Sequence, residues 1–120
     1  MKKCILIAED ERRLLYSIKI LVETIDDEFE VYSAENGRQA LDFINRRDID
    51  LLITDIFMPD MDGLELIREA QQKHPSTKIL AMSGGGDHYL RAAKSFGASY
   101  ILKKPFENCE LTSAIHEVFS

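Results

Sequence analysis

Several polar side chains that can do chemistry stand directly after apolar runs of strand length. They are the carboxylates Glu9, Asp10, Glu11 and Asp55, the hydroxyl of Ser83, and the ammonium groups of Lys103 and Lys104. Carboxylates that crowd together repel one another, which raises a pKa or recruits a cation. Oxygen ligands in octahedral geometry suit Mg²⁺, and a cation beside a carboxylate and a lysine neutralises a transferring phosphoryl group. These residue types therefore predict a Mg²⁺-assisted phosphoryl acceptor, if the fold brings them together.

The elements that position these groups follow a simple alternation. Apolar runs predict five strands, at Cys4–Ala8, Val31–Ala34, Leu51–Thr54, Ile79–Met82 and Tyr100–Leu102. Helical spacing of apolar residues predicts a helix after each strand, near 14–25, 40–44, 64–70, 90–96 and 111–118, with Asn108 as the N-cap of the last. Strict alternation gives a parallel sheet with helices on both faces. We predict an α/β domain over residues 1–120, a doubly wound (βα)5 unit with a five-stranded parallel sheet.

Parallel strands bring their carboxyl ends to one edge of a sheet, and ligands of doubly wound sheets lie beyond that edge. Because the polar groups all stand at strand ends, we expect them to converge there. Each group also has a plainer interpretation. The acidic run after the first strand caps a helix, and Asp55 starts a turn. Ser83 belongs to an ordinary loop, and Lys104 is a solvated surface lysine.

Composition limits the class of protein. The chain has 120 residues, of which 45% are apolar and 30% are charged, which is typical of one globular domain. Its formal charge of −6 argues against direct nucleic-acid binding. Cys4 and Cys109 fit free thiols in a reducing compartment. No apolar run is long enough for a membrane span or a signal peptide, so we expect a cytoplasmic protein.

Four segments together resemble the receiver domain of two-component response regulators, of which the bacterial chemotaxis regulator is the familiar single-domain example. They are ILIAEDE (5–11), LLITDIFMPDMDG (51–63), ILAMSGGG (79–86) and KKPF (103–106). The resemblance implies a flavodoxin-like three-layer sandwich and a phosphorylation-dependent signalling switch rather than a turnover enzyme. It implies a histidine kinase or a histidine phosphotransfer protein upstream. Downstream it implies either an unknown target protein or an effector domain of a longer chain, and a monomer or a phosphorylation-dependent dimer.

The resemblance assigns Asp55 as the phosphoryl acceptor, which forms an acyl phosphate by nucleophilic attack. It assigns Asp10, Asp55 and the backbone carbonyl of Phe57 as Mg²⁺ ligands, with Glu9 assisting directly or through water. The family more often has Asp at the position of Glu9, and the longer side chain changes the geometry offered to the metal.

The resemblance also makes Ser83 the switch hydroxyl, which bonds the phosphoryl oxygens, and makes Lys104 the partner of the phosphoryl charge. It implies a cis Lys104–Pro105 bond, and it leaves Lys103 as a bystander. The output surface is implied to lie on the fourth helix, the fifth strand and the fifth helix.

The chain departs from the family in its switch residues. The family often has an aromatic residue three positions before the active-site lysine, where this chain has Ile101. The neighbouring Tyr100 should face the other side of the sheet, because side chains alternate along a strand. We therefore do not expect the usual paired movement of hydroxyl and ring, and we expect the glycines at 84–86 to give the loop more of the switching. The resemblance implies that hydrolysis is tuned by the side chains two residues past the acceptor and two past the switch hydroxyl, which here are Phe57 and Gly85. Neither can orient an attacking water by hydrogen bonding, so we expect slow self-dephosphorylation.

Three other functions stay open at this stage. The first is a degenerate receiver that is never phosphorylated and acts as an interaction module. The second is a Mg²⁺-dependent phosphatase with an aspartyl nucleophile, which is disfavoured because Phe57 stands where such enzymes need a general acid. The third is a calcium loop at 60–63, which lacks the further oxygen ligands of that motif.

Overall fold

The structure is a computed structural model that describes residues 2–120, and within this range five strands alternate with five helices. The strands are β1 (Lys3–Ala8), β2 (Phe29–Ala34), β3 (Leu51–Asp55), β4 (Lys78–Ser83) and β5 (Tyr100–Lys103). The helices are α1 (Arg12–Ile25), α2 (Gly37–Arg46), α3 (Gly63–Lys73), α4 (Asp87–Phe96) and α5 (Asn108–Val118). The strands pair in parallel in the order β2-β1-β3-β4-β5. The predicted (βα)5 sheet is confirmed.

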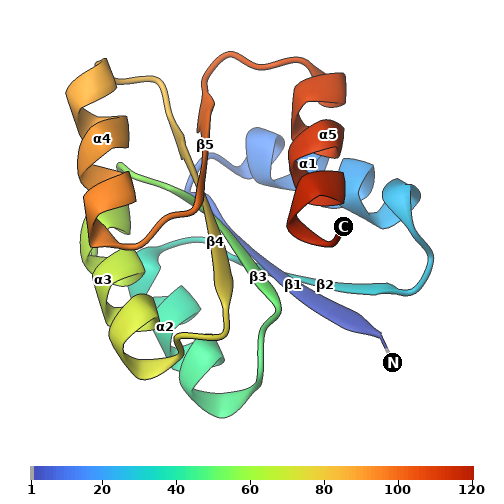
Figure 1. Cartoon of the computed structure of the whole chain (residues 1–120), viewed down its shortest axis with the longest axis horizontal. Helices are drawn as coiled ribbons and strands as arrows, with labels where there is room; N and C mark the ends of the chain where they lie inside the picture. Colours follow the sequence, from blue (N-terminus) through green and yellow to red (C-terminus); the bar gives the residue numbers. More distant parts are fainter. Residues whose placement is uncertain (1) are drawn as a thin grey trace.

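Helices cover both faces of the sheet and make three layers (Figure 1), with α2, α3 and α4 on one side and α1 and α5 on the other. The interior strand β1 shows how the sequence builds this arrangement. Leu6 and Ala8 pack in the core under α2, α3 and α4, whereas Ile5 and Ile7 pack in the core under α1 and α5. A strand buried on both faces must be apolar at successive positions, which explains the unbroken apolar runs.

Strands β3 and β4 each extend one residue beyond the predicted apolar run. Asp55 and Ser83 are therefore the last residues of their strands, held by the sheet. One predicted boundary is wrong, because Glu107 and not Asn108 is the N-cap of α5. The side chain of Glu110 accepts a hydrogen bond from the Glu107 backbone N–H at 2.9 Å, and this contact starts the helix one residue earlier.

The loop between β3 and α3 folds back onto the end of β3. The backbone N–H of Gly63 donates to the carbonyl of Ile56 at 2.7 Å. A Cβ atom at Gly63 would overlap the backbone oxygen of Asp55, so only glycine allows this approach. Asp62 caps α3 by accepting from the Glu65 N–H at 2.9 Å, which occupies one carboxylate of the alternative calcium loop. Among the helices of residues 2–120, none has the length and apolar character needed to cross a membrane.

Candidate functional site at the carboxyl edge of the sheet

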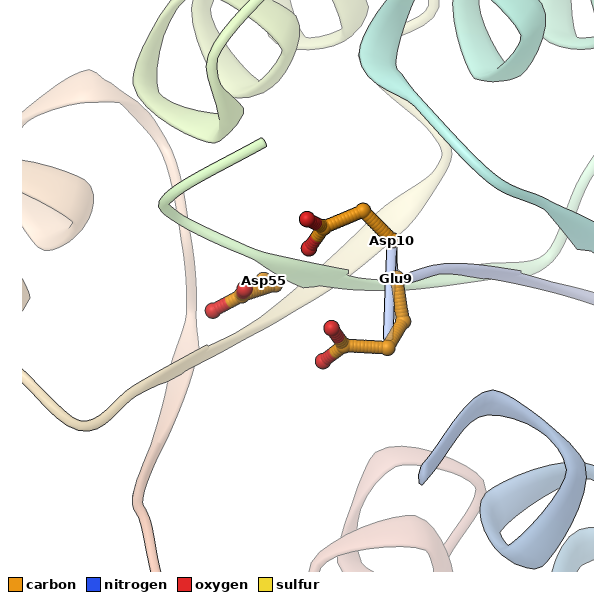
Figure 2. A group of neighbouring side chains, drawn as sticks. All are labelled: Glu9, Asp10 and Asp55. Carbon is orange, nitrogen blue, oxygen red and sulfur yellow. The ribbon is translucent and has the colours of Figure 1, made fainter. Parts of the chain in front are cut away.

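The topology brings the first and third strand ends together. Strands β1 and β3 are neighbours, and Ala8 pairs with Thr54, so Glu9 and Asp55 leave the sheet at the same level. After β1 the chain adds β2 on one side of β1 and later adds β3 on the other side of β1. The strand order therefore reverses between β1 and β3, which makes their carboxyl ends the switch point of the sheet. One carboxylate oxygen each from Glu9, Asp10 and Asp55 lies within 4.8 Å of the other two. Figure 2 shows the three carboxylates projecting to the same side of the strand ends.

The three acidic residues after β1 have different roles. Glu11 is the N-cap of α1, and its side chain accepts from the backbone N–H groups of Arg13 at 3.2 Å and Leu14 at 2.9 Å. The capping interpretation is therefore right for Glu11. Glu9 and Asp10 remain as carboxylates for the site. Glu9 has 1% of its surface exposed, and Asp10 is exposed to solvent.

Lys104 is the cation of this cluster. Its Nζ lies 2.7 Å from Oε1 of Glu9 and 3.3 Å from Oδ1 of Asp55, and its side chain is only 22% exposed. The interpretation of Lys104 as a solvated surface lysine is therefore wrong. The following bond to Pro105 is cis, as the resemblance implied. Lys103 points elsewhere, to an exposed pair with Asp87 at 3.4 Å.

Burial sets the electrostatics of the cluster. Removal from water raises the pKa of the Asp55 carboxyl and that of the Glu9 carboxyl, and the positive charge of Lys104 opposes both shifts without cancelling them. Burial alone would lower the pKa of Lys104, but its hydrogen bond to Glu9 and the charges of Asp55 and Glu9 raise it. The cluster holds three carboxylates, and its one ammonium group pairs with two of them, so it favours a further positive charge.

The donor set fits a hard divalent cation. All the side-chain donors are carboxylate oxygens, which Mg²⁺ prefers. Asp55 Oδ1 already accepts from the backbone N–H of Ile56 at 2.9 Å and faces Lys104, which leaves Oδ2 as the oxygen that accepts no hydrogen bond from residues 2–120. Both oxygens of Glu9 are occupied, Oε1 by Lys104 and Oε2 by the N–H of Glu11 at 3.1 Å. Asp10 and Asp55 are thus better placed than Glu9 to bind a metal directly.

Phe57 lies two residues beyond Asp55 in the loop that leaves β3, and the residue is 47% exposed. Its backbone carbonyl stays a predicted metal ligand. The aromatic ring makes an edge-to-face contact with Tyr89 on α4. Sequence patterns gave no indication of this contact, because the two residues belong to different elements.

Ser83 is fully buried at the end of β4, and its Oγ accepts from the backbone N–H of Gly85 at 3.0 Å. Its neighbour Met82 pairs with Asp55 across the sheet, so the hydroxyl lies at the same edge as the carboxylates. A hydroxyl fixed in this way is not part of an ordinary loop.

The two residues on β5 face opposite sides, as alternation predicted. Tyr100 packs with the core under α1 and α5, together with Leu102. Ile101 is 40% exposed. The aromatic ring nearest to Lys104 in β5 is therefore on the far side of the sheet from α4.

Comparison with known proteins shows which family and which fold the chain shares. The sequence profile of the response regulator receiver domain matches residues 5–116. The chain is 32% identical to the uncharacterized transcriptional regulatory protein YesN of Bacillus subtilis (strain 168) over 97% of its own length. It is 31% identical to the cell cycle response regulator CtrA of Brucella ovis over 95% of its length. It spans 32% of YesN and 49% of CtrA, so both relatives are longer proteins.

A solved structure shows the same fold. The response regulator receiver domain protein (CheY-like) of Methanospirillum hungatei JF-1 is 29% identical and superposes with a TM-score of 0.90, covering 98% of this chain and 93% of that one.

Proposed function

The chain belongs to the response regulator receiver domain family, and we propose that it is a signalling switch controlled by phosphorylation of Asp55. One observation carries the proposal. At the switch point of the sheet, a buried aspartate whose Oδ2 accepts no hydrogen bond from the described residues lies beside an ammonium group and two further carboxylates. A structural ion pair needs no such surplus of negative charge. An acceptor that must bind a cation together with a phosphoryl group needs it.

In the proposed reaction Oδ2 of Asp55 attacks the phosphorus of a phosphohistidine. An O–P bond forms, the N–P bond breaks, and the electron pair leaves with the imidazole. Lys104, next to Oδ1, pairs with the phosphoryl charge, and the hydroxyl of Ser83 donates to a phosphoryl oxygen. Because Lys104 already lies beside Asp55 before the reaction, its charge stabilises the transferred group with little reorganisation.

Mg²⁺ is the cation that we assign to this site. Asp10, Asp55 and the backbone carbonyl of Phe57 would hold it, with Glu9 assisting through water. When bound, it supplies positive charge that offsets the negative charge of the phosphoryl oxygens. Glu9 keeps a separate task in this proposal, since its buried carboxylate holds Lys104 in place.

The proposed phosphodonor is a histidine kinase or a histidine phosphotransfer protein. A groove of about 500 Å³ lies between α1 and α5 and reaches Gly84 and Lys104 at the edge of the site. Its lining is mostly apolar, with Leu14, Leu21 and Phe106 among the residues. A donor protein that delivers its histidine to Asp55 would contact this groove. The downstream partner is either a separate target or an effector domain of a longer chain.

Incubation with Mg²⁺ and acetyl phosphate, followed by intact-mass measurement, tests the proposal. We expect a gain of one phosphoryl group, lost in Asp55→Asn and after removal of the metal. Asp48→Asn is the matched control, because Asp48 is exposed and outside the cluster. If the wild-type mass stays unchanged and beryllofluoride also fails to bind, the chain is a degenerate receiver and the proposal is wrong.

A further inference from the structure

Two aromatic side chains from different elements meet at the edge of the site. Phe57 comes from the loop after β3, and Tyr89 comes from the first turns of α4. Their ring centroids are 4.7 Å apart and their planes cross at 76°, which is edge-to-face geometry. Such ring pairs attract one another beyond the burial of their surface. The contact joins the segment that carries Asp55 to the first helix of the implied output surface.

Both rings rest on Gly85. A Cβ atom at this position would lie 2.9 Å from Cε2 of Phe57 and 3.0 Å from Cδ2 of Tyr89. These distances are shorter than carbon atoms normally approach, so the pair in this geometry requires glycine. The backbone N–H of Gly85 also donates to Oγ of Ser83 at 3.0 Å. Gly85 therefore touches the hydroxyl on one side and the two rings on the other.

The paired movement of the hydroxyl and an aromatic ring on β5 is not expected in this chain. Ile101 has no ring, and Tyr100 packs on the opposite face of the sheet under α1 and α5. The glycine loop and the ring pair form a continuous route of packed atoms from Ser83 to α4.

We propose that the Phe57–Tyr89 contact, resting on Gly85, couples the acceptor loop to α4, with Tyr89 as a positioning residue. The inference rests on the proposed function, since it concerns the response to a group bound at Asp55. When the Ser83 hydroxyl turns to a phosphoryl oxygen, the bond from Gly85 must lengthen or follow it. Gly85 then moves beneath the rings, and the contact changes between the two states. Only a contact whose energy differs between states can shift their populations.

Amide hydrogen exchange across residues 87–96 measures this coupling, in Mg²⁺ with and without beryllofluoride. We expect the addition to change wild-type exchange in α4 by about threefold or more, as the energy of one aromatic pair allows. Phe57→Ala and Tyr89→Ala should abolish that difference, and Gly85→Ala should do the same by displacing the rings. Tyr89→Phe keeps the ring and should respond like the wild type.

Phe96→Ala is the matched control, since it removes a partly exposed aromatic side chain from the far end of α4. It should keep the response. In every variant, the rise in melting temperature on adding Mg²⁺ and beryllofluoride reports binding at Asp55 independently. If Phe57→Ala and Tyr89→Ala bind beryllofluoride and α4 still responds, the coupling is wrong and the acceptor role of Asp55 stands. If the wild type fails to bind, both proposals fail.

Discussion

Replacing Lys104 by methionine isolates the ion cluster as a source of stability. The methionine side chain keeps most of the apolar stem and removes the charge. Glu9, at 1% exposure, and Asp55, at 6%, would then be buried without their cation. Their raised pKa values show that each already carries an unfavourable burial cost at neutral pH.

The magnitude follows from the burial of the pair. Removing one partner of a fully buried ion pair costs roughly 3–5 kcal/mol. Lys104 is 22% exposed, so water reaches part of the cluster, and we take about 2 kcal/mol. For a domain of 120 residues the unfolding entropy is about 250 cal/mol/K, so Tm should fall by about 8 °C.

Thermal unfolding followed by circular dichroism at pH 7 without divalent cations measures the change. Lys103→Met is the matched control, because Lys103 and its partner Asp87 are 65% and 71% exposed. We expect that control to lose no more than about 2 °C. Adding Glu9→Gln to Lys104→Met removes one uncompensated charge and should recover roughly half of the loss. Equal melting temperatures for the Lys103 and Lys104 variants would refute the electrostatic account of the cluster.

Three further predictions concern the same site. Burial raises the pKa of Asp55, so its contribution to stability is present when it is protonated and is lost as pH rises through the folded-state pKa. Asp55→Asn should therefore melt a few degrees above the wild type at pH 7, and the advantage should vanish in acid; a lower Tm at pH 7 would contradict this. Asp10→Asn should weaken Mg²⁺ binding about tenfold or more in a calorimetric titration, whereas Asp48→Asn should leave it unchanged. Gly63→Ala should lower Tm by about 10 °C or more, because the new Cβ overlaps the Asp55 backbone. Gly84→Ala should change Tm little, because its Cβ would lie 3.7 Å from the nearest atom.

The sequence was informative about the fold because the apolar runs and the helical spacing are strong and alternate strictly. All five strands and all five helices lie where the pattern predicted them, with ends shifted by a few residues. The helix start at Glu107 was missed because a capping glutamate depends on its partner Glu110, and asparagine is the commoner N-cap.

The site was predictable as a set of residues and not as a set of contacts. Glu9, Asp10 and Asp55 could be placed at one edge of the sheet, because the carboxyl ends of parallel strands all lie at that edge. The side-chain partners of Glu9 were not predictable. Its Oε1 bonds Lys104, 95 residues away in sequence, and only the added length of glutamate over aspartate hinted at it.

The same limit applies to the ring pair. Phe57 and Tyr89 were each visible as aromatic residues, but their contact depends on how closely the glycine loop lets α4 approach the loop after β3. A run of three glycines predicts freedom of the backbone and says nothing about what packs against it.

The central claim is that Asp55 itself accepts the phosphoryl group, and peptide mapping tests it most directly. After reaction with acetyl phosphate, borohydride reduces an acyl phosphate and marks the modified residue permanently. Trypsin releases the peptide 48–68, which contains Asp55 and four other aspartates, so fragmentation distinguishes them. The account predicts reduction at Asp55 alone, dependent on Mg²⁺. Reduction at another aspartate of the peptide, or none in a fully folded sample, would contradict it.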